Sequence, residues 1–331
     1  MPRERGKLLI AQSYNRPEEF KPLERYADIF WLDRMSEEEQ ARILPLVDCL
    51  FSHGWPKALD SKVPLMKSLR FLQTGNAGVN TVRFDLLDKK VVVCSNVGGY
   101  SDEVAEFTVG LMMAAGKSIV GFDRELRSGD YRHPTLDVVG RRVAFFRGKV
   151  VGIVGYGGIG KSTARMVRGF GMKVLAYGRH PVKERGVTGL RGPGGLTRLL
   201  RESDVVILAV PLTKATKGLI GAQQLAAMKK DAILVNVARG EVVQKEAVFA
   251  HLKANPGFSY ATDVWWPGGD GRETFAPDLP FNELPNFIGT PHASGPTAII
   301  TGTMAKGVVE NFTRYFQGRP LKNVVDRSEY Q

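Results

Sequence analysis

Two polar residues directly follow strand-like apolar runs, where their side chains could do chemistry. His292 lies in the stretch 289–295, which holds two glycines and a proline, and Arg239 follows the apolar run 233–237. A histidine titrates near neutral pH and can give or take a proton, and a guanidinium binds a carboxylate through two hydrogen bonds. Ligands of open α/β sheets bind at the carboxyl ends of strands. The pair therefore predicts acid–base chemistry on an anionic substrate, although one such residue alone is more often structural.

A glycine-rich segment predicts a site for a phosphate-bearing cofactor. Its residues are Gly155, Tyr156, Gly157, Gly158, Ile159 and Gly160. The segment follows the apolar run 150–154 and precedes a run compatible with a helix, 161–169. In a dinucleotide-binding fold the first glycine makes the turn, the second admits the pyrophosphate and the third lets helix and strand pack closely. The amino end of the helix then attracts the phosphates.

The same segment also satisfies the pattern of a nucleoside-triphosphate-binding loop. Gly155 is followed by four residues and then by Gly160, Lys161 and Ser162, which is the spacing of that loop. Such an enzyme also needs an apolar strand that ends in an acidic magnesium ligand. Neither 205–210 nor 233–237 ends in one. The dinucleotide interpretation is therefore favoured.

The second strand after the glycine segment indicates which dinucleotide is bound. An NAD site usually places an acidic residue there, on the ribose 2′-hydroxyl. This chain has Gly178, Arg179 and His180 instead. The glycine removes a carboxylate that would repel a 2′-phosphate, and the arginine offers a planar donor group for one. We therefore predict NADP(H) as the preferred cofactor, with NAD(H) possible.

Composition restricts the class of protein. The chain has 331 residues, of which 43% are hydrophobic and 24% charged, which favours a globular protein of two domains. The net charge of +12 suits nucleic acid, an anionic membrane surface or small anionic ligands. The motifs favour the small anions, so neither a nucleic-acid nor a membrane partner is expected. The two cysteines lack the spacing of a disulfide framework or a metal site, so a cytoplasmic location is expected. No pair of histidines has the spacing of metal ligands.

Short apolar runs that alternate with helical stretches predict two α/β sheets. The first series of strands is expected at 7–12, 27–33, 47–52, 69–73 and 91–95. The second is expected at 150–154, 173–176, 204–209, 232–236, 260–264 and 287–289. Helical spacing predicts one long helix over 101–127, and a final helix over 296–317 that returns to the first domain.

Taken in order, seven segments make the chain resemble the D-isomer-specific 2-hydroxyacid dehydrogenases, the family of glyoxylate and hydroxypyruvate reductases, phosphoglycerate dehydrogenase and formate dehydrogenase. The matching segments are 75–80, 104–106, 155–160, 210–213, 235–240, 263–264 and 290–295. The resemblance implies two doubly wound parallel-sheet domains. A Rossmann-type cofactor domain, 100–292, would be inserted into a flavodoxin-like substrate domain, 1–99 and 293–331. It also implies a homodimer and decides against a triphosphatase.

The resemblance assigns roles to individual residues. Arg239 would bind the substrate carboxylate and polarise the carbonyl, while His292 would exchange a proton with its oxygen. Backbone groups of Asn76, Ala77, Gly78 and Val79 would complete the substrate site. Asp263 would accept a hydrogen bond from the nicotinamide carboxamide. The cofactor would also contact the glycine segment, Gly178 to His180, and Val210, Pro211, Val237, Ala238, Arg239, His292 and Ser294.

The family's third catalytic residue, a glutamate that raises the pKa of the histidine, has no direct match. Five positions after Asp263 stands Gly268. Counting back from His292 instead leads to Glu273, with an insertion through 268–271. We assign Glu273 on this ground, although a solvated loop carboxylate is nearly as good an interpretation.

Departures from the family pattern bear on the substrate. Residues 263–267 and 291–295 resemble formate dehydrogenase, yet Tyr100 replaces its formate-binding asparagine, and Gly268 stands at its glutamine position. Bulky residues, His53, Trp55 and Tyr100, are expected at the pocket mouth, which favours a small 2-oxo or 2-hydroxy acid such as glyoxylate or hydroxypyruvate. The alternatives are a formate dehydrogenase-like enzyme and a dinucleotide-binding sensor or corepressor-like module without turnover.

Overall fold

The computed structural model describes residues 5–12, 17–131, 144–267, 273–275, 278–295 and 300–330. The chain forms two compact units, an outer unit of Met1–Tyr100 and Thr297–Gln331 and an inserted unit of Ser101–Pro296. The domain boundaries expected from the sequence, after residues 99 and 292, lie close to these bounds. The two parallel-sheet α/β domains expected from the family resemblance are confirmed.

The outer unit is built on a five-stranded parallel sheet in the order β2-β1-β3-β4-β5. Its strands are β1 (Gly6–Ile10), β2 (Ala27–Trp31), β3 (Cys49–Ser52), β4 (Phe71–Thr74) and β5 (Val92–Cys94). Its helices are α1 (Glu37–Ile43), α2 (Leu59–Lys62) and α9 (Ile300–Phe316). This strand order is the flavodoxin-like one.

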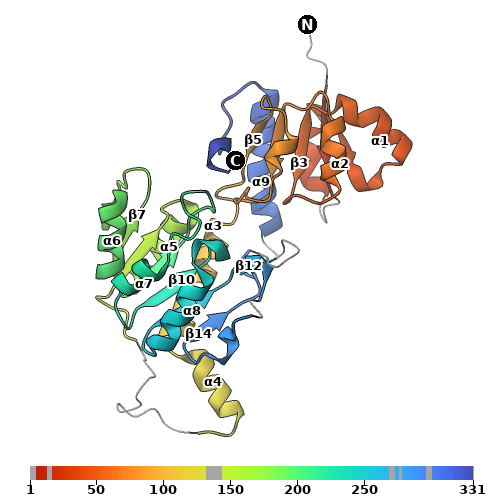
Figure 1. Cartoon of the computed structure of the whole chain (residues 1–331). Helices are drawn as coiled ribbons and strands as arrows, with labels where there is room; N and C mark the ends of the chain where they lie inside the picture. Colours follow the sequence, from red (N-terminus) through yellow and green to blue (C-terminus); the bar gives the residue numbers. More distant parts are fainter. Residues whose placement is uncertain are drawn as a thin grey trace. The chain divides into compact units, whose positions relative to one another are not determined.

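Side chains of this sheet alternate between two cores, because successive residues of a strand point to opposite faces. Leu9 lies in one core and Leu8 in the other. The core that contains Leu8 also holds Phe71, whose ring lies edge-on to Phe312 of α9 at 5.1 Å. The final helix thus covers the outer sheet, as the sequence predicted, and Figure 1 shows this blue helix beside the strands of the red and orange part of the chain.

The inserted unit is built on a seven-stranded parallel sheet in the order β14-β11-β10-β9-β6-β7-β8. Its strands are β6 (Val150–Val154), β7 (Lys173–Tyr177), β8 (Val187–Leu190), β9 (Val205–Leu208), β10 (Ile233–Asn236), β11 (Ser259–Thr262) and β14 (Phe287–Gly289). A two-stranded antiparallel hairpin is formed by β12 (Trp266–Pro267) and β13 (Glu273–Thr274). Apart from the added β14, the order is that of a Rossmann fold.

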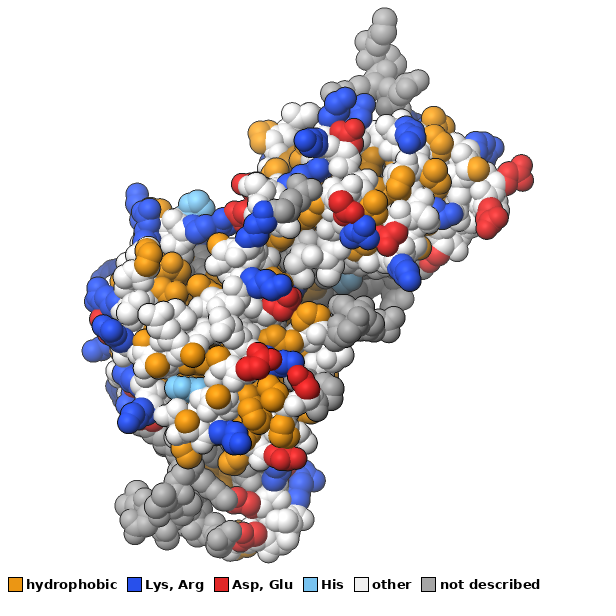
Figure 2. Space-filling model, viewed as in Figure 1, with side chains coloured by type: hydrophobic (Ala, Val, Ile, Leu, Met, Phe, Trp, Pro, Cys, Tyr) orange, Lys and Arg blue, Asp and Glu red, His pale blue; other side chains and the backbone are white. Residues whose placement is uncertain are grey.

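Helices cover the sheet of the inserted unit. They are α3 (Ser101–Gly116), α4 (Ile119–Arg127), α5 (Gly158–Gly169), α6 (Gly192–Glu202), α7 (Ala222–Ala227) and α8 (Lys245–Ala254). Leucines of α6, α7 and α8 share one buried core with the strands, and α3 packs against α5, β10 and β11. Figure 2 shows Lys and Arg side chains scattered over the visible face, among them a row along the edge that α6 occupies in Figure 1.

One sequence prediction was wrong. The helix expected over 101–127 is broken into α3 and α4, which are bent by 61°. Ser118 adopts a left-handed backbone, φ 51°, and Gly116 lies where a Cβ would come within 2.4 Å of the Phe146 ring. Apolar spacing continues through this break, which is why periodicity did not reveal it.

Within the described ranges no single helix is long and apolar enough to cross a membrane, and only the bent pair of α3 and α4 taken together reaches that length and composition.

Candidate active site

The glycine segment has the local geometry that a dinucleotide requires. Gly155 follows β6 with φ +101°, and a Cβ on it would lie 2.4 Å from the Ala209 carbonyl oxygen. A Cβ on Gly160 would lie 2.2 Å from the Gly155 oxygen, so this glycine lets α5 approach the strand. Gly157 instead borders open space. These residues fit a pyrophosphate, which would meet the N–H groups at the start of α5.

The triphosphate-loop interpretation fails at Ser162. Its hydroxyl donates to Asp102 Oδ1 at 2.6 Å, and the residue is buried. Arg165 Nη2 also donates to this oxygen at 2.8 Å, and both bonds hold the pKa of Asp102 below its usual range. A serine engaged in this way links α5 to α3 and is not presented as a magnesium ligand.

The strand beyond the glycine loop ends at the predicted adenosine end of the cofactor site. Gly178 follows β7, and a Cβ on it would lie 3.9 Å from atoms of Tyr156, which places β7 against the glycine loop. Arg179 and His180 are exposed in the following loop. The Tyr156 hydroxyl donates to Glu184 Oε2 at 2.7 Å. Sequence reasoning missed Glu184, because no local pattern signals a contact across 28 positions.

The loop after β9 lies between the glycine segment and the predicted catalytic strands. Its predicted cofactor residues are Val210, which is half-buried, and Pro211, which is exposed. Thr216 holds this loop in place. Its hydroxyl donates to the Pro211 carbonyl at 2.6 Å and accepts from Thr213 N at 2.8 Å.

Arg239 stands in a loop that is fixed by Asn236, the last residue of β10. The Asn236 amide nitrogen donates to the Arg239 carbonyl at 3.0 Å, and its oxygen accepts from Ala238 N at 3.0 Å. The guanidinium of Arg239 donates to the Ala238 carbonyl at 2.7 Å and is half-buried. Val237 and Ala238, also predicted cofactor contacts, are 6% and 5% exposed, so little of either is accessible.

His292 lies in a loop that begins where β14 ends, and its backbone is unusual. Its φ of +54° is in the left-handed region, which a residue with a Cβ rarely adopts. Such conformations persist only where the surroundings enforce them, and they concentrate at functional sites. The residue is exposed, and its N–H donates to the Thr290 carbonyl at 3.0 Å.

Asp263 supplies those surroundings. It follows β11, the strand between β10 and β14, and it is fully buried. Its Oδ1 accepts from the Thr290 hydroxyl at 2.6 Å and from Ala293 N at 2.8 Å, and its Oδ2 accepts from Ser294 N at 2.9 Å. These bonds flank His292 on both sides. Whether Asp263 also accepts from a nicotinamide carboxamide stays a prediction.

Glu273, the predicted third catalytic residue, lies in β13 opposite Pro267 of β12. The insertion predicted at 268–271 falls outside the described residues. The hairpin is tied to the His292 loop through Trp265, whose indole N–H donates to the Thr290 carbonyl at 2.8 Å. Phe275, two residues after Glu273, packs edge-on to the Trp265 ring at 4.8 Å.

In the outer unit, the predicted substrate loop follows β4. Asn76 Oδ1 accepts from Gly54 N at 2.5 Å, and the Asn76 carbonyl accepts from the Thr74 hydroxyl at 2.9 Å. Among the described residues, no acceptor is found for the backbone N–H groups from Asn76 to Val79. Successive N–H groups in a loop form a concave site that suits an anion.

The bulky residues expected at the pocket mouth also lie in the outer unit. His53 packs over Gly75, on which a Cβ would lie 2.7 Å from His53 Nδ1. Burial lowers the pKa of His53, and its Nδ1 has no hydrogen-bond partner among the described residues. Trp55 donates to Asp60 Oδ1 at 2.8 Å, and Tyr100 contacts Met304 Sδ with its hydroxyl at 2.6 Å.

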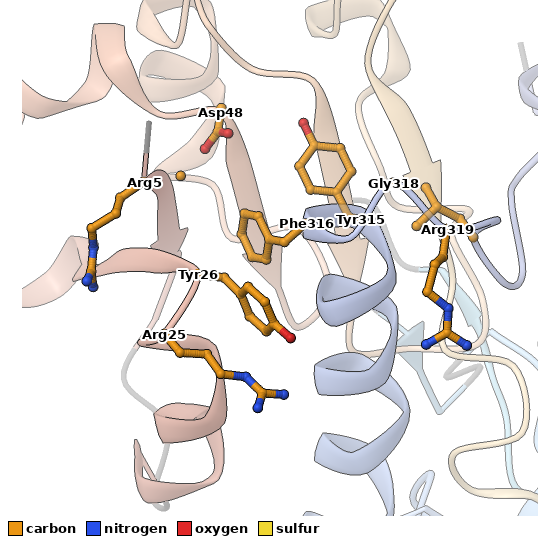
Figure 3. Close-up of a pocket in the computed structure, with 10 residues that line it drawn as sticks. Arg5, Arg25, Tyr26, Asp48, Tyr315, Phe316, Gly318 and Arg319 are labelled. Carbon is orange, nitrogen blue, oxygen red and sulfur yellow. The ribbon is translucent and has the colours of Figure 1, made fainter. Parts of the chain in front are cut away.

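A cavity of about 590 Å³ in the outer unit lies elsewhere, near the amino ends of β1 and β3. Arg5, Arg25 and Arg319 line it, but Figure 3 shows their guanidinium groups pointing in different directions. Arg5 is bound to Asp28 at 2.9 Å. The cavity contains none of the predicted site residues. Across the described ranges, no group of three histidine, cysteine or acidic residues could hold a metal ion.

In the inserted unit, the predicted catalytic and cofactor residues follow the carboxyl ends of its strands. Arg239, Asp263 and His292 follow the neighbouring strands β10, β11 and β14, and the glycine segment follows β6 in the same parallel sheet. Because all these strands are parallel, their carboxyl ends form one edge of the sheet. The residues predicted from the sequence thus follow strands that end at one edge of the sheet, whereas the bonds that fix the loops at this edge were not predicted.

The chain is similar to known proteins over most of its length. The family model of the D-isomer specific 2-hydroxyacid dehydrogenase, NAD binding domain, matches residues 109–294. A glyoxylate reductase of Korarchaeum cryptofilum is 35% identical over 264 residues, 74% of this chain and 74% of that protein. A glycerate dehydrogenase of Methylorubrum extorquens is 31% identical over 293 residues, 81% of this chain and 85% of that protein.

A crystal structure similar to this one is that of a proposed formate dehydrogenase from Pyrobaculum aerophilum. It is 30% identical, with a TM-score of 0.80, and the match covers 98% of this chain and 100% of that one. The agreement of family model, relatives and fold shows that the chain belongs to the D-isomer specific 2-hydroxyacid dehydrogenases, which are oxidoreductases with an NAD-binding domain.

Proposed function

We propose that the protein reduces a small 2-oxo acid to the D-2-hydroxy acid with NADPH. The observation that carries this proposal is the shared edge of the inserted sheet. Arg239 and His292 follow strands on either side of Asp263, and the glycine segment follows β6 at the same edge. Relatives named glyoxylate reductase and glycerate dehydrogenase support an acid of two or three carbons.

The residues divide the chemistry between them. When bound, the reduced nicotinamide supplies the hydride, which adds to C2 of the substrate. The charge that develops on the carbonyl oxygen needs a donor at that oxygen. His292 donates a proton to this oxygen, and Arg239 binds the carboxylate and polarises the carbonyl. The N–H groups from Asn76 to Val79, for which the described part of the chain offers no acceptor, would bind the same carboxylate.

The remaining assignments extend this proposal. Glu273 would act as a positioning residue that raises the pKa of His292. The cofactor contacts remain those predicted from the sequence, and Gly178 with Arg179 supports the preference for a 2′-phosphate. The cytoplasmic location and the homodimer remain predictions from the sequence and the resemblance.

A cofactor oxidation assay at 340 nm tests the proposal. Glyoxylate, hydroxypyruvate and pyruvate are each supplied with NADPH and with NADH, and formate is supplied with NADP⁺. We expect turnover of a small 2-oxo acid and a higher kcat/KM with NADPH. Equal kcat/KM with NADH would refute the cofactor preference. Tight cofactor binding with no turnover would favour the sensor, and formate oxidation would favour the formate dehydrogenase alternative.

Replacing the glycine after β7 tests the cofactor preference directly. A Cβ at Gly178 would meet only ordinary contacts, the nearest atoms being 3.9 Å away, so Gly178→Asp should fold normally. The new carboxylate would repel a 2′-phosphate and accept from a 2′-hydroxyl. We expect the ratio of kcat/KM for NADPH over NADH to fall at least tenfold. Gly178→Ala is the matched control, which adds the Cβ without the charge.

A further inference from the structure

A hydrogen bond joins the glycine loop to the loop beyond β7. The Tyr156 hydroxyl, in the glycine loop, donates to Glu184 Oε2 at 2.7 Å. Glu184 lies between β7 and β8, in a turn where its carbonyl accepts from Val187 N at 3.2 Å. The loop Gly178–Gly186 contains no strand or helix of its own. The bond thus ties an irregular loop to the segment that fits the pyrophosphate.

Each oxygen of the Glu184 carboxylate has a partner. Arg168 of α5 lies with its Nη1 3.7 Å from Glu184 Oε1, while the other oxygen accepts from Tyr156. The guanidinium also lies over Gly186, where a Cβ would come within 3.1 Å of its Nη2. Gly186 has φ +80°, so the turn itself needs a glycine there. A carboxylate with both oxygens engaged is a poor acceptor for a ribose hydroxyl and repels a nearby phosphate less.

The pair borders the predicted subsite for the cofactor 2′-phosphate. A Cβ on Gly178 would lie 3.9 Å from Tyr156 Cβ and N, so Tyr156 contacts the start of the loop that carries Arg179 and His180. Burial and the bond to Glu184 raise the pKa of Tyr156, which keeps its hydroxyl protonated as a donor. The loop therefore begins beside Tyr156 and is held near its end by the bond from Tyr156 to Glu184.

We propose that Tyr156 and Glu184 are a positioning pair that fixes the loop Gly178–Gly186 in the conformation that binds the 2′-phosphate of NADP(H). This inference rests on the NADP(H) preference of the proposed function and names residues beyond it. The pair acts through Arg179 and His180. Its loss should weaken recognition of the 2′-phosphate and leave the binding of the rest of the cofactor largely unchanged.

Two cofactor fragments separate these effects. Adenosine 2′,5′-bisphosphate carries the 2′-phosphate and 5′-AMP lacks it, so calorimetric titration of both probes measures this subsite without turnover. Tyr156→Phe removes the donor, and Glu184→Gln removes the charge while it keeps an acceptor. Glu202→Gln is the matched control, because Glu202 forms an exposed pair with Arg198 at 2.7 Å on α6.

We expect Tyr156→Phe to raise the Kd of the bisphosphate about fivefold to tenfold, which is the effect of losing one hydrogen bond of ordinary net strength. Glu184→Gln should raise it about twofold to threefold. The Kd of 5′-AMP should change less than twofold in both variants. Glu202→Gln should behave as the wild type with either probe.

Three results would overturn the inference. An equal loss for both probes would show a general structural role, no loss in Tyr156→Phe would show that the bond is idle, and tighter bisphosphate binding by Glu184→Gln would show that Glu184 repels the phosphate. The proposed function fails in a different way. If the wild type binds the bisphosphate no better than 5′-AMP, the NADP(H) preference itself is wrong and this inference falls with it.

Discussion

Replacing Asp263 with asparagine tests whether one buried carboxylate holds the loop that carries His292. The variant keeps the size of the side chain. One oxygen still accepts from the Thr290 hydroxyl and Ala293 N, but an NH₂ group replaces the oxygen that accepts from Ser294 N at 2.9 Å. Two donors then face each other in a fully buried position.

The magnitude follows from the bond that is lost. A hydrogen bond to a charged group contributes about 1.5–3 kcal/mol, and a buried donor left without an acceptor costs about 1–3 kcal/mol. We expect the native loop conformation to lose about 2–3 kcal/mol, which corresponds to a decrease of about 30-fold to 150-fold in the equilibrium constant that favours it. The backbone strain at His292, with its φ of +54°, adds to the tendency to rearrange.

Steady-state kinetics and thermal unfolding together measure this prediction. We expect kcat/KM for the 2-oxo acid to fall by about 30-fold to 150-fold, mostly through kcat. Thr290→Val is the matched comparison, because it removes one donor to Asp263 and leaves the carboxylate in place. Its effect should be smaller. If Asp263→Asn keeps kcat/KM within threefold of the wild type, the loop does not depend on this carboxylate. A rise confined to the KM for NADPH would instead support a hydrogen bond from the nicotinamide to Asp263.

Three further predictions concern other parts of the chain. Gly160→Ala should lower the free energy of unfolding by about 1–3 kcal/mol in urea titrations, because its Cβ would overlap a carbonyl oxygen at 2.2 Å. Gly157 borders open space, so Gly157→Ala should keep the stability of the wild type and lose only cofactor affinity. Arg239→Lys keeps the charge but loses the planar pair of donors, so the KM for the 2-oxo acid should rise at least tenfold, and an unchanged KM would remove Arg239 from carboxylate binding. Burial lowers the pKa of His53, so the unfolded state binds the proton more readily and stability should decrease as pH falls through about 6.5, the unperturbed value. Denaturation of His53→Gln at pH 7 and pH 5 should show a weaker pH dependence than the wild type, with His251→Gln, whose pKa is also lowered by burial, as a second case.

The parts of the fold that the sequence predicted well are those with strong local signals. β6 and β14 have the predicted bounds. β6 is a nearly fully buried apolar run in the middle of its sheet, which gives a strong signal, and β14 is a short apolar run at the edge. The edge strand β8 was missed, since Thr188 and Gly189 are exposed and no apolar pattern marks it. The break at Ser118 was missed for the opposite reason, because the apolar spacing runs through it.

The candidate site divides in the same way. The three glycines could be identified from sequence, because each answers a requirement of the local backbone, and the structure shows the turn at Gly155 and the close approach at Gly160. The hydrogen bonds that support the site could not be identified from the sequence. Asp263 holds a loop that begins 27 positions later, and Tyr156 reaches Glu184 across 28 positions, so both contacts exist only once the strands are assembled.

The nested arrangement of the two units also has a consequence for synthesis on the ribosome. The five strands of the outer sheet are complete by Cys94, but α9, which covers Phe71 and its neighbours, begins only at Ile300. Until that helix emerges, the aromatic face of the sheet stays exposed to water and to other chains. The inserted unit, whose sheet and helices are continuous in sequence, can fold during this interval, since domains generally fold as units as they emerge. Nascent chains that end before residue 300 should therefore be the ones that bind chaperones.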